Sequence, residues 1–312
     1  MLAITPHSTI NFMRTNLKVH LALFTVSLLY GATFSIAKVA MPEFVKPFAF
    51  ILLRVIVATI CIFLFHRHYV KGAIHDKKDL LPLVISAMFG VAGNMLLFFK
   101  GLSITSPINA SVLMLNTPIF VLVFAAIILK EKLTLTKISG IAIAAVGALL
   151  LMGGTRFQFH PETVWGDVYV TLNAIIYAFY LVYAKRLMVK YHPLTVTLYS
   201  FFFGFFMVLP FGLNQALEID FLNLPSHIWM AIAFVTIGST FLTYVLNAYA
   251  LKHASSGLVG SYIYLQPVLA TLIAIGLGKD MLTPQKFISI LVVFGGVYLA
   301  SFHKKSAQEI KK

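Results

Sequence analysis

The chain has 312 residues, of which 60% are hydrophobic and only 11% are charged, and its formal net charge is +14. An average soluble domain has about 25% charged residues, so the composition excludes an ordinary soluble protein and indicates a membrane protein. The positive charge would also suit nucleic-acid binding. The basic residues, however, gather in the short connections between apolar runs, where they are typical of a membrane topology.

Ten apolar runs follow one another along the chain. A helix needs about 20 consecutive apolar residues to span the hydrocarbon core of a bilayer. Runs of about this length lie at 18–38, 47–65, 80–100, 105–129, 137–154, 165–185, 194–213, 227–250, 256–278 and 284–302. The alternation of barrel strands is absent, and helices satisfy the backbone in lipid. The sequence therefore predicts an all-α membrane protein with ten transmembrane helices.

A proline-containing run that ends in a basic–acidic pair occurs twice, 149 residues apart. The first copy begins at Asn116-Thr117-Pro118 and ends in Lys130-Glu131, and the second begins at Gln266-Pro267 and ends in Lys279-Asp280. The first and sixth runs also match, since Tyr30 to Lys38 has the same spacing as Tyr177 to Lys185. The protein is thus predicted to be a duplicated unit with five spans in each copy.

The duplication divides the chain into four parts. The first five-helix repeat covers 18–154, a polar linker covers 155–164, the second repeat covers 165–302, and a basic tail covers 303–312. Because five is odd, the second copy must insert upside down. This is an inverted-topology repeat, an arrangement in which two related halves give alternating access to a site between them.

The basic residues set the orientation, because Lys and Arg are enriched in cytoplasmic loops. With the N-terminus inside, seventeen of the 24 Lys and Arg residues are cytoplasmic and six are outside, while Arg54 lies within a span. Both termini are therefore predicted to be cytoplasmic. The excess charge is interpreted as contact with anionic lipid head groups, and the expected partners are the lipid bilayer and a small-molecule substrate, with no nucleic acid.

These motifs, in this order, resemble the drug/metabolite transporter superfamily in its two-domain EamA branch. The resemblance rests on Tyr30-Gly31 and Lys38, on Arg54, on the two proline runs with their basic–acidic ends, and on Gly-rich fifth and tenth runs. It covers about residues 18 to 302. It implies a ten-helix inverted-repeat fold and the movement of small metabolites, often export, across a bacterial inner (plasma) membrane. Asp280 and Ser289 depart slightly from the pattern.

Arg54 is the most informative single residue. It lies near the middle of the second run, and a charge at a helix centre costs roughly 2.5–3.5 kcal/mol on insertion scales. One interpretation is a cation that faces a central cavity and meets an anionic group of the substrate. The other is structural, with Arg54 bonded to backbone carbonyls. Lys38 is a further candidate, although long lysines at span ends often reach the interface instead.

Polar and aromatic side chains of the other spans could line the same cavity, or could join helices by hydrogen bonds. The candidates are Tyr30, Asn94, Asn116, Thr117, Asn173, Tyr177, Tyr180, Tyr244, Asn247, Tyr262 and Gln266. Pro118 and Pro267 are candidate hinges, because a proline frees the backbone carbonyl one turn earlier.

All ten acidic residues are predicted to lie in loops or at span ends. A buried carboxylate that exchanges protons for a cationic substrate is therefore not expected. A cavity with cations and without carboxylates favours amino-acid-like or carboxylate-bearing solutes. The sequence predicts a secondary transporter, an exporter or facilitator, that works by alternating access at the repeat interface. It does not fix the direction of transport or a coupling ion.

Several alternatives remain. A nucleotide-sugar or phosphorylated-metabolite antiporter would be expected to have more cationic residues within its spans, because its substrate is larger and more strongly anionic. A channel or an intramembrane enzyme is disfavoured, because no filter repeat is seen and Ser35 with Lys38 is a short pattern expected by chance. Neither a cofactor nor a metal is expected, since Cys61 is the one cysteine and no His pair has ligand spacing within a span. Small residues at Gly140, Gly147 and Gly296 indicate close helix packing, at a repeat interface or in a homodimer.

Overall fold

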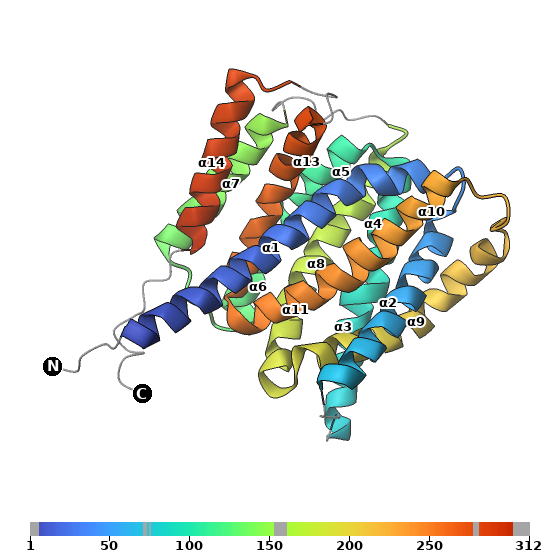
Figure 1. The fold of residues 1–312 in the computed structure, drawn as a ribbon, viewed down its shortest axis with the longest axis horizontal. Coiled ribbons are helices and arrows are strands. Elements are labelled where there is room, and N and C mark those ends of the chain that lie inside the picture. The colour runs from blue at the N-terminus through green and yellow to red at the C-terminus, as the bar shows by residue number, and fades with distance from the viewer. Residues whose placement is uncertain (1–5, 71–73, 75, 153–160, 277–280, 302–312) are drawn as a thin grey trace.

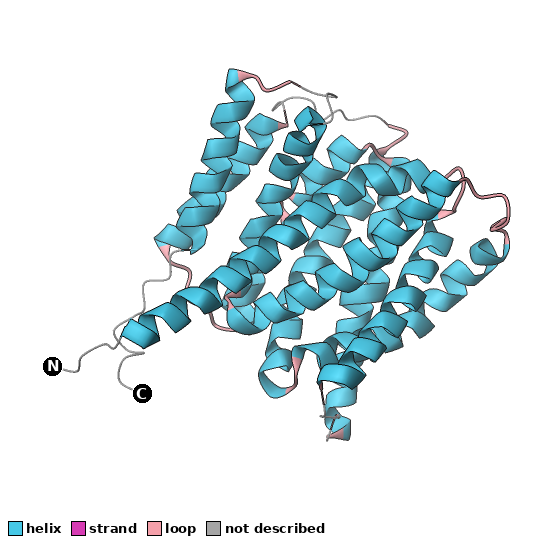
Figure 2. Ribbon diagram, in the orientation of Figure 1, coloured by secondary structure: helices cyan, strands magenta, loops and turns pink. Residues whose placement is uncertain are grey.

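The computed structural model describes residues 6–70, 74, 76–152, 161–276 and 281–301. Figure 2 shows that these residues form helices joined by short loops, with no strand among them. The first repeat contains α1 (Pro6–Ala40), α2 (Pro47–Tyr69), η1 (Lys77–Asp79), α3 (Leu80–Ala87), η2 (Met88–Ala92), α4 (Gly93–Ile104), α5 (Pro107–Met114), α6 (Thr117–Ile128) and α7 (Leu135–Leu151). The second contains α8 (Val164–Lys190), α9 (Pro193–Leu217), α10 (Ser226–Ala233), η3 (Phe234–Leu242), α11 (Thr243–His253), α12 (Ser256–Ser261), η4 (Tyr262–Tyr264), α13 (Leu265–Gly276) and α14 (Pro284–Ser301).

The predicted fold class is confirmed. Within the described ranges, nine helical stretches are long and apolar enough to cross a membrane, and α7 supplies a tenth, shorter apolar helix of 17 residues. The predicted number of helices agrees with the structure, but some predicted helix boundaries do not. Helix α1 begins at Pro6, well before residue 18, because no helix breaker follows Pro6 and a proline is well tolerated in the first helical turn. The pair Lys279-Asp280, most of the predicted linker and the predicted tail lie outside the described residues.

The fifth and tenth helices, α7 and α14, pack side by side and run in opposite directions (Figure 1). A Cβ on Gly140 would lie 2.4 Å from the backbone nitrogen of Ala300, and one on Gly147 would lie 2.8 Å from that of Val293. As residue numbers rise along α7, the numbers of the contacting residues on α14 fall, so the two helices are antiparallel. This is the geometry of an inverted pair, and it puts the predicted small-residue stripe at the contact between the two repeats.

The second and seventh helices, α2 and α9, form another antiparallel pair between the repeats. Near one end, the backbone N–H groups of Phe48 and Ala49 donate to Gln215 Oε1 at 3.0 and 3.3 Å. Near the other end, His66 Nε2 lies 2.9 Å from the hydroxyl of Thr195. Between these two ends, Arg54 of α2 is the one buried charged residue of the described pair.

The first helix of each repeat packs against the third and fourth helices of the other repeat. Helix α1 packs on α11 and α13, and α8 packs on α4 and α6. The two repeats therefore interlock through these contacts. The first four helices of both copies surround a central space. Helices α7 and α14 lie at one side of this group (Figure 1).

Four of the enclosing helices are irregular at repeat-related places. The fourth span is broken between α5 and α6, just before Pro118, and the ninth passes through the 3₁₀ turn η4 just before Pro267. The third and eighth spans contain the π-helical segments η2 and η3, and η2 shifted by the 149-residue repeat falls inside η3. Such irregular backbone at membrane depth is tolerated where it is buried in protein or lines a cavity.

Candidate functional site

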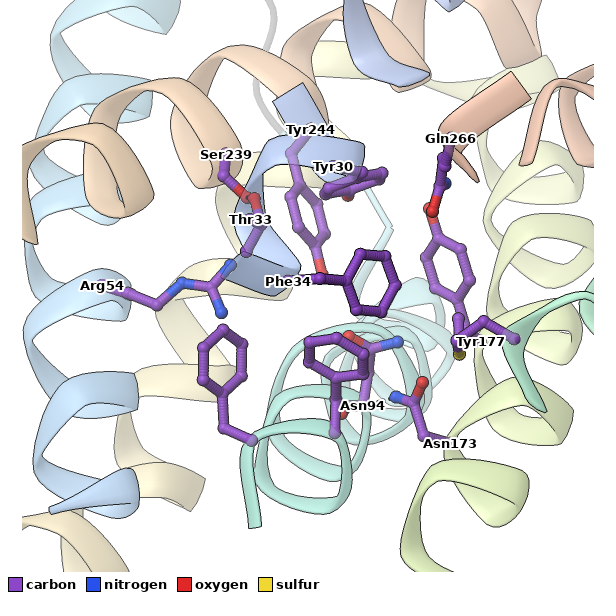
Figure 3. Close-up of a pocket in the computed structure, with 13 residues that line it drawn as sticks. Tyr30, Thr33, Phe34, Arg54, Asn94, Asn173, Tyr177, Ser239, Tyr244 and Gln266 are labelled. Carbon is purple, nitrogen blue, oxygen red and sulfur yellow. Dashed lines mark hydrogen bonds between the residues drawn. The ribbon is translucent and has the colours of Figure 1, made fainter. Parts of the chain in front are cut away.

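A cavity of about 60 Å³ lies at the centre of the bundle, between the two repeats. Figure 3 shows its side chains converging from both halves of the chain. The lining residues are Tyr30, Thr33, Phe34, Arg54, Asn94, Phe98, Phe99, Met114, Asn173, Tyr177, Ser239, Tyr244 and Gln266. The lining is aromatic, with a few amides and hydroxyls and one cationic side chain.

Arg54 extends from α2 into this cavity and is only 4% exposed. Its Nε donates to the hydroxyl of Thr240 in η3 at 2.8 Å, and its guanidinium carbon lies 4.2 Å from the centre of the Phe99 ring. Its Nη1 is buried and has no hydrogen-bond partner. The charge is thus held by one hydroxyl and one aromatic face, and the buried Nη1 is left without a hydrogen-bond partner.

The two π-helical segments exchange contacts across the repeats. Arg54 of the first repeat reaches Thr240 in η3, while Tyr244 of the second repeat donates its hydroxyl to the carbonyl of Gly90 in η2 at 2.6 Å. The Thr240 hydroxyl in turn donates to the carbonyl of Val235, five residues earlier. A π-helical turn widens the backbone spacing, and such turns are frequent at functional sites.

The side of the cavity near α8 is formed by amides and a phenol. The Nδ2 of Asn173 donates to the backbone carbonyl of Asn94 at 2.7 Å, and its Oδ1 is buried without a partner. The Nδ2 of Asn247 lies 3.4 Å from the hydroxyl of Tyr177. Asn173 and Tyr177 lie across the cavity from Arg54 (Figure 3), whereas Asn247 lines the small adjoining space.

Two further spaces adjoin the cavity. A cleft of about 620 Å³ is lined by residues of α1, α5, α13 and α14, including Ser35, Thr271 and Lys286. A much smaller space lies on the other side, between α1, α8, α11 and the α12–η4 region. Gln266 lines all three spaces, and Phe34 lines both the cavity and the cleft. These two side chains therefore separate the cavity from the cleft.

Close contact between α1 and Gln266 depends on Gly31. A Cβ at this position would lie 2.7 Å from the carbonyl oxygen of Gln266. Any larger residue would push α1 away from the irregular turn that precedes Pro267. The Tyr30-Gly31 pair of the sequence motif thus combines a cavity-lining phenol with the residue that permits this approach.

The structure brings eight of the predicted site residues to these spaces. Tyr30, Arg54, Asn94, Tyr177, Tyr244 and Gln266 line the central cavity, and Asn247 and Tyr262 line the small adjoining space. The hinge candidate Pro267 lines the cleft, while Pro118 is buried at the start of α6. Asn173, part of the wider polar set, also lines the cavity.

Four other candidates lie elsewhere. Lys38 donates to the carbonyls of Leu102, Ser103 and Thr105 at 2.8–3.3 Å, so it caps the C-terminal end of α4. Tyr180 is buried beside η2, where a Cβ on Gly90 would overlap its ring. Asn116 is exposed and bonds the carbonyl of Leu113, and the hydroxyl of Thr117 is buried without a partner.

Sequence reasoning missed Thr33, Phe34, Phe98, Phe99, Met114 and Ser239 as lining residues. Thr33 could have been found, because it lies three residues after Tyr30 and shares its helix face. The hydroxyls of Thr33 and Ser239 meet at 2.6 Å. The phenylalanines carry no such signal among the 28 in the chain.

The acidic residues in the described ranges do not line the cavity. Asp167, in the first turn of α8, is nonetheless 5% exposed, with Oδ1 accepting from the hydroxyl of Thr105 and Oδ2 without a partner. Glu131 pairs with Lys185 and Lys137 at 3.2 and 3.8 Å. The part of the chain that the structure describes holds no group of three or more His, Cys, Asp or Glu residues placed to bind a metal.

A model of the EamA-like transporter family matches residues 17–153 and 164–302. The chain belongs to the EamA-like transporter family. Each match covers one copy of the repeat, so this membrane protein contains two EamA units. Its homologues are described as transporters, and the chain is a membrane transporter of this family.

Relatives from bacteria and archaea match along nearly the whole length. The chain is 26% identical over 288 residues to the uncharacterized transporter YyaM of Bacillus subtilis, covering 90% of this chain and 92% of YyaM. It is 26% identical to an uncharacterized transporter of Archaeoglobus fulgidus, covering 92% and 98%. It is 25% identical to the uncharacterized inner membrane transporter YedA of Escherichia coli K12, covering 91% and 90%.

A solved crystal structure shares the fold. It superposes with a TM-score of 0.73 at 21% identity, covering 91% of this chain and 96% of the other.

Proposed function

We propose that this transporter moves a small amino-acid-like or carboxylate-bearing metabolite across the bacterial inner membrane by alternating access, as an exporter or facilitator. The proposed binding site is the Arg54 cavity between the repeats. One observation carries the proposal: Arg54 Nη1 is a buried donor without a partner in a cavity whose described lining contains no carboxylate. An unpaired buried charge is costly, so an anionic solute that pairs with it is bound favourably.

The size of the spaces supports alternating access. A cavity of about 60 Å³ is too small for a whole metabolite, whereas the adjoining cleft of about 620 Å³ is within the usual range for small-molecule sites. Displacement of Phe34 and Gln266 would join the two spaces. A solute would then enter through the cleft and place its carboxylate on Arg54.

The other end of the bundle is closed by polar contacts. His20 Nδ1 meets the hydroxyl of Tyr262, and Lys185 bonds both Glu131 and the carbonyl of Ala254. With both termini cytoplasmic, this closed end is the cytoplasmic one and the cleft opens outward. The conformation is then an outward-facing state.

The proposed topology is tested by cysteine labelling in a Cys61→Ser background. Lys132→Cys should react only with an impermeant reagent added from the cytoplasm, and Asn223→Cys, in the α9–α10 connection, only from outside. Reaction of both positions from the same side would exclude the proposed orientation.

The charge selection is tested with purified protein in proteoliposomes. We expect uptake of a carboxylate solute to exceed that of its amide, and Arg54→Gln to abolish the difference. Arg54→Lys should retain part of the activity if charge alone matters, and should lose it if the planar fork is needed. The matched control is Arg186→Gln, because Arg186 is exposed at the end of α8. Equal uptake of acid and amide, unchanged by Arg54→Gln, would assign Arg54 to helix packing.

A nucleotide-sugar or phosphorylated-metabolite antiporter is the alternative. A phosphate group carries more charge than a carboxylate and is usually held by several cations. Arg54 is the single cation lining the described cavity, although Lys286 lines the cleft. The carboxylate is therefore the better fit.

A further inference from the structure

A row of polar contacts connects Arg54 with a side chain that separates the cavity from the cleft. Arg54 Nε donates to the hydroxyl of Thr240 in η3 at 2.8 Å. The neighbouring residue of η3, Ser239, has its hydroxyl 2.6 Å from that of Thr33 in α1, and Figure 3 shows these two side chains meeting. Thr33 is followed in α1 by Phe34, which lines both the cavity and the cleft. The row therefore runs from α2 through η3 to the barrier.

The segment η3 packs against both of the helices that it bonds, α1 and α2. Successive side chains of a helix point in different directions, so Thr240 reaches α2 while its neighbour Ser239 reaches α1. Both residues are fully buried. A displacement of η3 at one of these contacts therefore also acts on the other.

The side chain of Thr33 is fixed on two sides. Its hydroxyl oxygen lies 2.7 Å from the carbonyl oxygen of Leu29, one turn earlier in α1, as well as 2.6 Å from the Ser239 hydroxyl. The ring of the next residue, Phe34, packs edge-on against that of Phe98, with 5.6 Å between the ring centres. The position of the barrier thus depends on how this turn of α1 is held against η3.

We propose that Thr33 and Ser239 link the state of Arg54 to the Phe34 barrier. The link rests on the proposed function, in which Arg54 receives the solute. When the guanidinium pairs with a solute, its bond to Thr240 changes, and η3 passes the change to α1 through the two hydroxyls. Thr33 and Ser239 are then positioning residues, because they act on the barrier rather than on the solute.

Such a link would give the transport cycle its order. A solute shifts the barrier between two positions only if it binds the two states with different affinity. The row of contacts supplies a difference, because Arg54 is bonded to η3 in the present state. Coupling between two places requires an element with two arrangements that both places bias, and the π-helical segment η3 is the element that both places contact.

The link is tested by the rate at which a cysteine in the cavity reacts with methyl methanethiosulfonate. This reagent is small and neutral, so the charge of Arg54 does not change its approach. The protein is purified, free of solute and in a Cys61→Ser background. Met114 lines the cavity, and Ser111, three residues earlier in α5, lines the cleft. Reaction of Met114→Cys reports opening of the barrier, and reaction of Ser111→Cys reports the cleft in front of it.

We expect Ser239→Ala, Thr33→Val and Arg54→Gln each to speed the reaction of Met114→Cys about threefold or more. The reaction of Ser111→Cys should not change. Arg54→Gln combined with Ser239→Ala should be no faster than the faster single variant, because both changes break the same row. Thr33→Ser keeps the hydroxyl and should retain the native rate.

Thr59→Val is the matched control, and it should leave both rates unchanged. Thr59 is partly buried in α2, the helix of Arg54, and its hydroxyl bonds the carbonyl of Val55 within that helix. The melting temperature of each variant reports its folding. If Ser239→Ala does not fold, Thr33→Val takes its place in the double variant.

Three results would overturn the link. The first is an unchanged rate of Met114→Cys in Arg54→Gln, the second is equal acceleration at Ser111→Cys, and the third is a double variant in which the effects of Arg54→Gln and Ser239→Ala multiply. Each of these results would leave the proposed function standing. The proposed function fails by a separate measurement, equal uptake of acid and amide, which the labelling rates do not contain.

Discussion

Arg54 in α2 donates its Nε–H to the hydroxyl of Thr240 in the π-helical segment η3, at 2.8 Å. The two residues are 186 positions apart and belong to different repeats. The Thr240 hydroxyl uses its own hydrogen on the carbonyl of Val235, so it is free to accept from Arg54. The position of the single cation in the described cavity thus depends on the wide turn of η3.

Thr240→Val should reduce both stability and solute affinity. The change keeps the shape of the side chain but leaves a second guanidinium donor unpaired in a buried site, which we expect to lower the free energy of unfolding by about 1–3 kcal/mol. Thermal unfolding in detergent measures the loss. Thr25→Val is the matched control, since Thr25 is only partly buried and bonds only the carbonyl one turn earlier in α1. Equal stability of the two variants would show that Thr240 does not hold Arg54.

Much of the fold could be predicted because a membrane restricts the choice of structure. The ten apolar runs and the 149-residue repeat were sufficient for the number of helices and their inverted arrangement. What could not be predicted is local: the π-helical segments of the third and eighth spans depend on contacts such as that of Tyr244 with Gly90, which pair residues distant in sequence. The starts and ends of helices also escape a hydropathy argument, as at Pro6.

The candidate site was predictable in part, for a similar reason. Arg54, Tyr30 and Gln266 stand out in sequence because polar groups within an apolar run are conspicuous. Lys38 stands out equally, yet its amine caps α4. A lysine can reach several partners along its long side chain, and only the packed structure decides which one it meets. Phe34 could not be identified, since an apolar residue in a span is the ordinary case.

Gly296→Ala should destabilise the contact between α7 and α14. The added Cβ would lie 2.4 Å from the backbone nitrogen of Ala144, and backbone atoms of a packed helix cannot move aside cheaply. Overpacking of this kind costs about 1–3 kcal/mol. The neighbouring Gly295→Ala is the control: no atom lies within 4 Å of its Cβ, and alanine is the better helix former by up to about 1 kcal/mol. A lower melting temperature for Gly295→Ala than for Gly296→Ala would contradict this account of the repeat contact.

Pro118→Ala and Pro267→Ala should each slow transport while leaving insertion near normal. Each proline follows an interruption of its span, between α5 and α6 or at η4, and alanine would allow a continuous helix that bends less readily. Uptake into proteoliposomes measures the effect. Pro210→Ala is the control, because α9 runs through Pro210 without a break. Normal transport by the double variant would remove the hinge role.

Glu131→Gln should favour opening of the end of the bundle opposite the cleft. Lys130 adopts a left-handed conformation with φ of 53°, and the following N–H bonds back to Ala125, so this turn aims Glu131 at Lys185 and Lys137. Removing the charge should weaken the contact by about 1–2 kcal/mol, which corresponds to a factor of about 5–30 in the population of the open state. The measurement is the rate at which Val259→Cys, in a Cys61→Ser background, reacts with an impermeant thiol reagent; Val259 lines the small space behind this contact and is 4% exposed.

The same labelling rate distinguishes this ion-pair cluster from a surface pair. Glu218→Gln removes the partner of Lys46, but both of those side chains are more than half exposed, and exposed pairs contribute about 0–1 kcal/mol. We therefore expect faster labelling of Val259→Cys with Glu131→Gln and little change with Glu218→Gln. Lys185→Met should act like Glu131→Gln, because it removes the other half of the pair and the bond to the Ala254 carbonyl. If neither Glu131→Gln nor Lys185→Met speeds labelling, the cluster does not hold this end closed, and the His20–Tyr262 contact becomes the group to vary next.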